Sequence, residues 1–163
     1  MIQVNVHNET GKLRTVLVGI ADDLGGTPAL EDCYDPKSKQ NVIAGTYPSE
    51  EDCVAELNAL IQVFEKYGVK VFRPKNIKGL NQIFSRDIAF VIEGTLVLPN
   101  IIHQRRGEST AIGEVQNLLA DEDVIAMPAE SRAEGGDVMP WNEFIFVGYS
   151  AQEDFKKYTS ART

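Results

Sequence analysis

Two acidic segments carry the side chains best suited to do chemistry. Asp87 ends the polar run at residues 81–87 and directly precedes the apolar run at 88–92, and Glu134 opens Glu134-Gly-Gly-Asp137 ahead of another apolar run. A carboxylate at the start of a strand has its direction fixed by the rigid element behind it, as a binding group requires. We therefore predict that both segments form the chemical centre. Taken alone, each has a simpler interpretation, as a turn cap or as the start of a hairpin.

The sequence lacks the usual signatures of nucleophilic, metal and nucleotide chemistry. Cys33 and Cys53 are far apart and have no neighbouring histidine, so they fit neither a metal-binding spacing nor an activated thiol. His7 and His103 stand in no triad-like context. No glycine-rich phosphate-binding pattern occurs either. We therefore predict no metal and no cofactor.

The composition is that of one globular domain with its own core, at 163 residues with 43% hydrophobic and 25% charged residues. The formal net charge of −8 disfavours nucleic acid and anionic membrane surfaces, which bind basic patches. It suits a cationic small molecule, although acidic charge also serves solubility alone. The sequence shows no signal-peptide pattern and no apolar run near the roughly 18 residues of a membrane span. We expect a cytoplasmic protein without nucleic-acid or membrane partners.

The elements that must position these side chains begin with a strand at residues 13–20 and another at 69–73. Between them we predict a helix that follows Ser49 as its N-cap and ends at Gly68. Its apolar stripe consists of Val54, Leu57, Ile61, Phe64 and Tyr67. Residues 21–48 are too long for an ordinary connection, so we expect either a lid or an insertion without a role.

The second half contains a strand, strand, helix, strand unit that is complete once and begins again. We predict one hairpin at residues 88–92 and 95–99 and a second at 138–140 and 144–147. Between them we predict a helix at 107–120 and a strand at 124–127, and one face of the helix carries Ile112, Val115, Gln116 and Leu119. A final helix is predicted at 153–158. A repeated unit of this length predicts a modular α/β architecture rather than a doubly wound sheet.

Several segments together resemble the guanidino-group-modifying enzymes, namely the arginine deiminases, the dimethylarginine dimethylaminohydrolases (DDAH) and the amidinotransferases. The matching motifs are Gly11-Lys-Leu-Arg-Thr-Val-Leu-Val-Gly19, Asn81-x-x-Phe-x-Arg-Asp87, Arg105-Arg106 ahead of a Glu, Glu134-Gly-Gly-Asp137, and Phe146-Val-Gly-Tyr149 leading to Ser160-Ala-Arg-Thr163. Each motif is weak alone, but their shared order over nearly the whole chain is specific. The resemblance implies the pentein fold, a five-bladed α/β propeller of ββαβ modules around a central substrate pocket.

The resemblance also implies a covalent chemistry. In this family a cysteine thiolate attacks the guanidinium carbon, a histidine moves protons, and acids bind the guanidinium nitrogens. By motif match, Asp87 would bind the substrate guanidinium, and Glu134 would bind its nitrogens beside the histidine. Carboxylates suit this role because a planar cation with several N–H donors is met by two acceptor oxygens at once.

The arginines of the motifs receive roles from the same resemblance. Arg105 or Arg106, together with Arg162, would hold the α-carboxylate of the substrate, and we include Arg86 and Asp137 among the substrate-binding residues. Arg86 stands where DDAH enzymes tend to carry an acid, which favours the deiminase side slightly. Without the resemblance, the paired arginines are most simply solvated surface charges.

The chain stops at the Arg-Thr motif, whereas the histidine and cysteine of the family lie beyond it. We therefore expect the N-terminal half of a single pentein domain, inactive alone, from a hydrolase acting on arginine or a methylarginine. An amidinotransferase is the alternative. A different class of protein is a non-catalytic half-propeller that binds guanidino compounds or pairs with the missing modules, a partner chain or its own copy. A third alternative is an acidic fold that binds no ligand, and it requires the motif matches to be coincidental.

Overall fold

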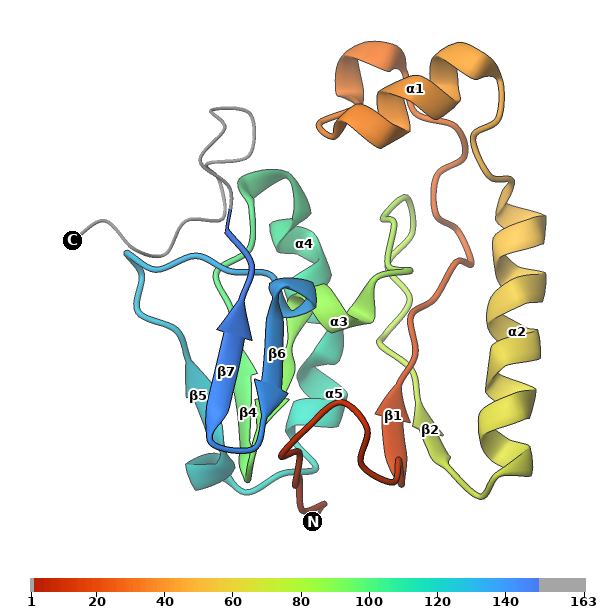
Figure 1. Ribbon diagram of the computed structural model, residues 1–163. Coiled ribbons are helices and arrows are strands. Elements are labelled where there is room, and N and C mark those ends of the chain that lie inside the picture. The colour runs from red at the N-terminus through yellow and green to blue at the C-terminus, as the bar shows by residue number, and fades with distance from the viewer. Residues whose placement is uncertain (1, 150–163) are drawn as a thin grey trace.

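The computed structural model describes residues 2–149 (Figure 1). The helix predicted at residues 153–158, the motif at 160–163 and Arg162 lie outside the described residues. Within residues 2–149 the strands form three small sheets, ordered β1-β2, β3-β4-β5 and β6-β7. No helix of this part of the chain is long and apolar enough to cross a membrane.

The first sheet pairs β1 (Thr15–Leu17) in parallel with β2 (Lys70–Phe72), and α2 (Glu50–Lys66) connects them along one side of the molecule (Figure 1). The Ser49 side chain caps α2 by accepting a hydrogen bond from the Asp52 backbone N–H at 3.1 Å. Gly68 adopts a φ of 72°, the left-handed conformation that glycine takes without strain just after a helix. The predicted start and end of this helix are confirmed.

The apolar stripe of α2 is only half-buried. Val54, Leu57, Ile61 and Phe64 are partly covered, but Tyr67 is 77% exposed and does not belong to the stripe as predicted. The reason is local, because Tyr67 is already the C-cap residue and has left the helical conformation.

The segment at residues 21–48 is not a loop throughout. It contains the short η1 (Leu30–Asp32) and then α1 (Pro36–Ala44), which lies at the top of Figure 1. The Asp35 side chain caps α1 by accepting from the Ser38 backbone N–H at 2.8 Å, and Pro36 occupies the first turn. The helix has no buried residue and therefore no apolar stripe, which is why periodicity alone did not predict it.

The central sheet contains β3 (Phe90–Ile92), β4 (Thr95–Leu98) and β5 (Val124–Ala126). β3 pairs antiparallel with β4, and β4 pairs parallel with β5, as the predicted ββαβ unit requires. Beneath it lies an apolar core of Ile88, Ile101 and Ile112, against which Leu17, Ala89 and Leu98 pack.

The predicted strand at residues 88–92 begins later than expected. Asp87 lies in the one-turn helix α3 (Ser85–Ile88), and the strand starts at Phe90. Ser85 ties this turn to the first sheet by donating its hydroxyl to the backbone carbonyl of Leu17 at 2.9 Å. The Asp87 carboxylate is therefore positioned by a helical turn anchored to β1, rather than by the strand itself.

The predicted helix at residues 107–120 is broken into short pieces. These are η2 (His103–Arg105), α4 (Arg106–Ser109), η3 (Thr110–Ile112) and α5 (Gly113–Gln116), followed by η4 (Asp121–Asp123). The Thr110 hydroxyl donates to the Gly107 backbone carbonyl at 2.8 Å, and Gly113 follows within a turn. Side-chain competition for the backbone and a flexible glycine both weaken a continuous helix.

The last hairpin forms as predicted, with β6 (Val138–Trp141) antiparallel to β7 (Phe144–Val147). It follows η5 (Gly135–Asp137), which covers the Gly-Gly-Asp segment. Every residue of β7 is exposed, and no described strand pairs with its outer edge. The hairpin thus presents an apolar surface, the β6–β7 flank, made of Met139, Trp141, Phe144, Ile145, Phe146 and Val147, each 42–58% exposed.

Candidate functional site

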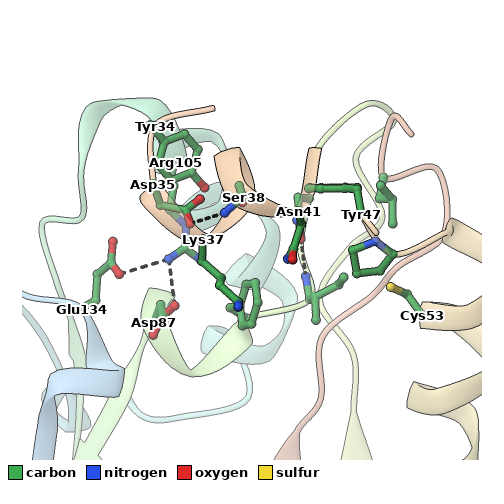
Figure 2. A pocket seen from close by; sticks show the side chains of 15 residues that line it. Tyr34, Asp35, Lys37, Ser38, Asn41, Tyr47, Cys53, Asp87, Arg105 and Glu134 are labelled. Carbon is green, nitrogen blue, oxygen red and sulfur yellow. Dashed lines mark hydrogen bonds and ion pairs between the residues drawn. The ribbon is translucent and has the colours of Figure 1, made fainter. Parts of the chain in front are cut away.

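A pocket of about 360 Å³ lies between α1 and the elements that carry the two acidic segments (Figure 2). One side, the acidic wall, is formed by Asp87, Arg105 and Glu134 together with Asn81, Ile83 and Phe84. The opposite side, the α1 wall, is formed by Tyr34, Asp35, Lys37, Ser38, Asn41, Tyr47 and Pro48, with Leu24 and Cys53. The long segment at residues 21–48 therefore supplies much of the lining, and its role as a lid stays a prediction.

A guanidinium group lies at the centre of the acidic wall. Arg105, only 6% exposed, donates to both carboxylate oxygens of Glu108 at 2.7 Å. Its Nη1 also donates to Oδ2 of Asp87 at 2.8 Å and to Oε2 of Glu134 at 3.2 Å. Three carboxylates from α3, α4 and the residue before η5 thus surround one cation, with a formal excess of two negative charges. The structure brings the two predicted acidic segments together.

Burial and charge shift the protonation of this cluster in opposing ways. Burial alone would lower the pKa of Arg105, but the hydrogen bonds to Glu108 and Asp87 raise the pKa above its usual value. Burial raises the pKa of Glu108, and the Arg105 guanidinium offsets this only in part. Burial and then the charge of Asp87 raise the pKa of Asp137. Arg105 therefore remains a cation, and the acids around it are held together by it.

The paired glycines are needed for close approach. A Cβ atom on Gly135 would lie 2.1 Å from the backbone carbonyl oxygen of Arg86, and one on Gly136 would lie 2.6 Å from Oδ1 of Asp87. The Gly136 backbone N–H donates to that same oxygen at 3.2 Å. Any larger residue would push the turn away from α3. The Gly-Gly sequence is what brings Glu134 beside Asp87.

The predicted arginines are placed very differently from one another. Arg105 is not a solvated surface charge, and four of its five N–H donors are occupied by carboxylates. Arg106 is exposed and does not line the pocket. Arg86 does not line the pocket either, and instead joins the carboxylate of Glu9 at 2.8 and 3.1 Å. The preference for a deiminase that rested on Arg86 therefore has no support from the pocket.

Arg86 also holds the acidic segment in place. Its Nε donates to the backbone carbonyl of Gly135 at 3.2 Å, and its Nη2 donates to that of Val138 at 2.9 Å. Asp137 is half-buried beside this turn, and its backbone carbonyl accepts from Gly148 at 2.8 Å, but it does not line the pocket. Both residues support the turn that carries Glu134.

Sequence reasoning missed Glu108 and most of the α1 wall. Glu108 is 3% exposed and three residues after Arg105, a spacing at which helical side chains meet, so its pairing could have been predicted. Tyr34, on the α1 wall, is 43% exposed, and the partial burial of its ring raises the pKa of its phenol to about 12, so the phenol stays protonated at neutral pH. For the wall the available signal was the Asp35-Pro36 helix start.

Both cysteines carry free thiols, and Cys53 lines the pocket. Burial raises the pKa of Cys53, and the neighbouring Glu56 and Asp52 raise it further. A thiol of this kind is a poor nucleophile, because only the thiolate attacks. Within residues 2–149, no group of three or more His, Cys, Asp and Glu side chains could hold a metal ion.

Comparison with known proteins gives structural matches only. No family model matches the chain, and no curated protein does. Among solved structures, it is similar to an amidinotransferase of the saxitoxin biosynthetic pathway from Microseira wollei, with a TM-score of 0.61, 21% identity, and coverage of 84% of this chain and 52% of that one. The inosamine-phosphate amidinotransferase from Streptomyces griseus has a TM-score of 0.58 and 19% identity, and the match covers 85% of this chain and 53% of that one. DDAH from Pseudomonas aeruginosa, complexed with citrulline, has a TM-score of 0.60 and 18% identity, and the match covers 86% of this chain and 51% of that one.

The chain thus spans about half the length of these three solved structures. At these identities the similarity establishes the fold, and it agrees with the expectation of a half-domain whose small sheets are not closed into a ring. The described part of the chain has the α/β fold of the pentein-type guanidino-group enzymes.

Proposed function

We propose that this chain is the guanidinium-binding half of a guanidino-group enzyme, in which Asp87 and Glu134 bind the guanidinium of a small cationic substrate. The observation that carries the proposal is Arg105, whose guanidinium already lies between these two carboxylates at 2.8 and 3.2 Å. Carboxylate oxygens have more than one lone pair, so each acid can accept a further N–H donor. The formal negative excess around Arg105 favours a second cation in the pocket.

For the complete enzyme we favour hydrolysis of arginine or a methylarginine. A cysteine thiolate outside this chain would form a bond to the guanidinium carbon, and the C–N bond to the departing amine would break as that amine takes up a proton. Water would then displace the thiolate. The alternative is an amidinotransferase, in which an acceptor amine replaces water. Both kinds of enzyme are among the structural matches, and the acidic wall serves either reaction equally.

A nuclear magnetic resonance titration of the chain with L-arginine and with L-citrulline tests the proposal. Citrulline replaces the guanidinium by a neutral urea group of similar shape. We expect arginine to shift the backbone amide signals of Gly135 and Gly136, which adjoin both acids, more strongly and at lower concentration than citrulline.

The variant Asp87→Asn removes one acceptor charge from the pocket, and Asp121→Asn removes the same charge from an exposed residue. We expect the first to weaken arginine binding at least about tenfold, because hydrogen bonds to charged groups contribute about 1.5–3 kcal/mol, and the second to leave it unchanged. Equal binding by the two variants, or equal shifts with arginine and citrulline, would contradict the proposal.

A second candidate function, a half-propeller that pairs with further modules or with its own copy, is favoured by the β6–β7 flank. Apolar side chains gathered on one exposed hairpin mark an interaction surface. Analytical ultracentrifugation should show association that Phe144→Asp abolishes and Glu143→Lys, in the hairpin turn, does not. A monomer across the whole concentration range would rule out self-pairing.

A further inference from the structure

Among the residues that the structure describes, two cationic side chains line the pocket, Arg105 and Lys37. The donors of Arg105 are largely occupied by its three carboxylates, so it has little capacity to hold an anionic group as well. Lys37 is exposed and forms no salt bridge with a described residue. In Figure 2 its side chain extends from α1 into the pocket. Of the two, Lys37 is the cation available to a ligand.

The position of Lys37 costs α1 some stability. The first turn of α1 contains no acid, whereas that of α2 contains Glu50, Glu51 and Asp52. A cation near a helix N-terminus opposes the helix dipole, so helix stability does not account for Lys37. Lys39 is in the same region of α1 but does not line the pocket, so the two lysines form a matched pair that differs in access to the ligand.

The neighbours of Lys37 on the α1 wall are polar. Ser38 and Asn41 both line the pocket and can donate hydrogen bonds to an anionic oxygen. The Asn41 side-chain oxygen accepts from the Thr46 hydroxyl at 3.4 Å, which orients the amide. Asp35, the one acid on this wall among the described residues, is engaged as the cap of α1. The α1 wall therefore offers one cation and two neutral donors opposite the acidic wall.

We propose that Lys37, with Ser38 and Asn41, binds an anionic group at the end of the substrate remote from the guanidinium. That group is a carboxylate or a phosphate, which share the negatively charged oxygens that a lysine ammonium recognises. The inference rests on the proposed function, because it takes the guanidinium end to lie on the acidic wall. It makes Lys37 a specificity-determining residue and places substrate selection in α1.

The test compares three probe compounds that share a guanidinium end. L-arginine carries a carboxylate, agmatine is the same molecule without it, and 4-guanidinobutyl phosphate carries a phosphate. Dissociation constants are measured by nuclear magnetic resonance for the unchanged chain and for Lys37→Met, which keeps an unbranched side chain without the charge. Lys37→Arg restores the charge, and Lys39→Met is the control that removes an equal charge outside the pocket.

We expect Lys37→Met to weaken binding of arginine about fivefold, the upper end for a solvent-exposed ion pair, and to leave agmatine binding unchanged or tighter. Lys37→Arg should restore arginine binding, and Lys39→Met should alter neither ligand. A greater loss for the guanidino phosphate than for arginine would assign a phosphate-bearing substrate, and the reverse would assign a carboxylate.

The outcomes separate this inference from the proposed function. If agmatine and arginine bind and Lys37→Met weakens both equally or neither, the role of Lys37 is overturned and the guanidinium site stands. If Lys39→Met acts as strongly as Lys37→Met, the effect is long-range charge and the inference is overturned. If none of the three compounds binds at the pocket, both proposals fail.

Discussion

The two walls of the pocket are built in opposite ways. The acidic wall consists of side chains that hold one another, with Arg105 tied to three carboxylates and the Gly135–Gly136 backbone resting on α3. On the α1 wall, Lys37, Ser38 and Asn41 stand on a helix with no buried residue. Changes to the acidic wall should therefore cost folding stability as well as binding, whereas changes to the α1 wall should alter binding almost alone. Substitutions on both sides can break or sharpen this contrast.

The largest effect is expected from Arg105→Met, which leaves three carboxylates together without their cation. Removing one partner of a buried ion pair costs about 3–5 kcal/mol, because the other charges remain buried and unpaired. Urea unfolding should show this loss at neutral pH, while Arg106→Met, at an exposed position, should change the unfolding free energy by less than about 0.5 kcal/mol. Similar unfolding curves for the two variants would contradict a structural role for the cluster.

The same variant should have an altered pH dependence. Burial already raises the pKa of Glu108 in the folded chain, and loss of Arg105 removes the group that lowers it. A carboxyl group with a raised folded pKa stabilises the fold below its unfolded pKa, about 4.3 for Glu, and loses that contribution as pH rises through the folded pKa. Arg105→Met should therefore recover stability relative to the unchanged chain as pH falls toward 4. A constant difference between pH 7 and pH 4 would refute this.

A somewhat smaller effect is expected from Gly135→Ala. The new methyl group would lie 2.1 Å from the backbone carbonyl oxygen of Arg86, so the turn must move away from α3. Forced displacement of a packed segment costs about 1–3 kcal/mol, and it should also separate Glu134 from Arg105. Gly94→Ala is the matched control, since a Cβ atom there meets nothing within 4 Å. Chemical denaturation of both variants measures the difference, and equal stabilities would show that the turn does not need its glycine.

A third comparison concerns the Arg86 contacts. Glu9→Gln removes one charge from a pair whose side chains are 49% and 35% exposed, so we expect a loss of less than about 1 kcal/mol. Arg86→Gln also leaves the carbonyls of Gly135 and Val138 without their donor, and the expected loss is about 1–3 kcal/mol. Urea unfolding of the two variants measures both losses of unfolding free energy. Equal losses for Glu9→Gln and Arg86→Gln would contradict the backbone-anchoring role of Arg86.

The smallest effect on stability is expected on the α1 wall. Lys37→Glu places an acid in the first turn of α1, where it favours the helix dipole by about 0.3–1 kcal/mol. Thermal unfolding should show a slight gain or no change, although the substitution would abolish any preference for an anionic ligand. A marked loss of stability would mean that Lys37 holds the fold together, against the contrast between the two walls.

Much of the fold could be predicted because local signals agreed with the tertiary structure. The cap at Ser49 and the glycine at position 68 defined α2, and the alternation of short apolar runs with turns defined both hairpins. The predictions were wrong where local signals were weak or conflicting. The helix predicted at residues 107–120 is broken around Gly107, Thr110 and Gly113. The helix α1 was not predicted, because it has no apolar face that would give a periodic pattern in the sequence.

The sequence by itself determined that two acidic segments, at Asp87 and at Glu134 beside its paired glycines, could form the chemical centre, and the family resemblance gave them a guanidinium to bind. It also predicted the ββαβ unit that orders them. Only the tertiary structure decided which of the three candidate arginines enters the pocket. Arg86, Arg105 and Arg106 are alike in chemistry, and the contacts that separate them come from Glu9, Glu108, Asp87 and Glu134, most of them distant in sequence. Apart from Glu108, which is three residues from Arg105, such contacts follow from the packing of α3, η2 and the turn at η5, which no local pattern encodes.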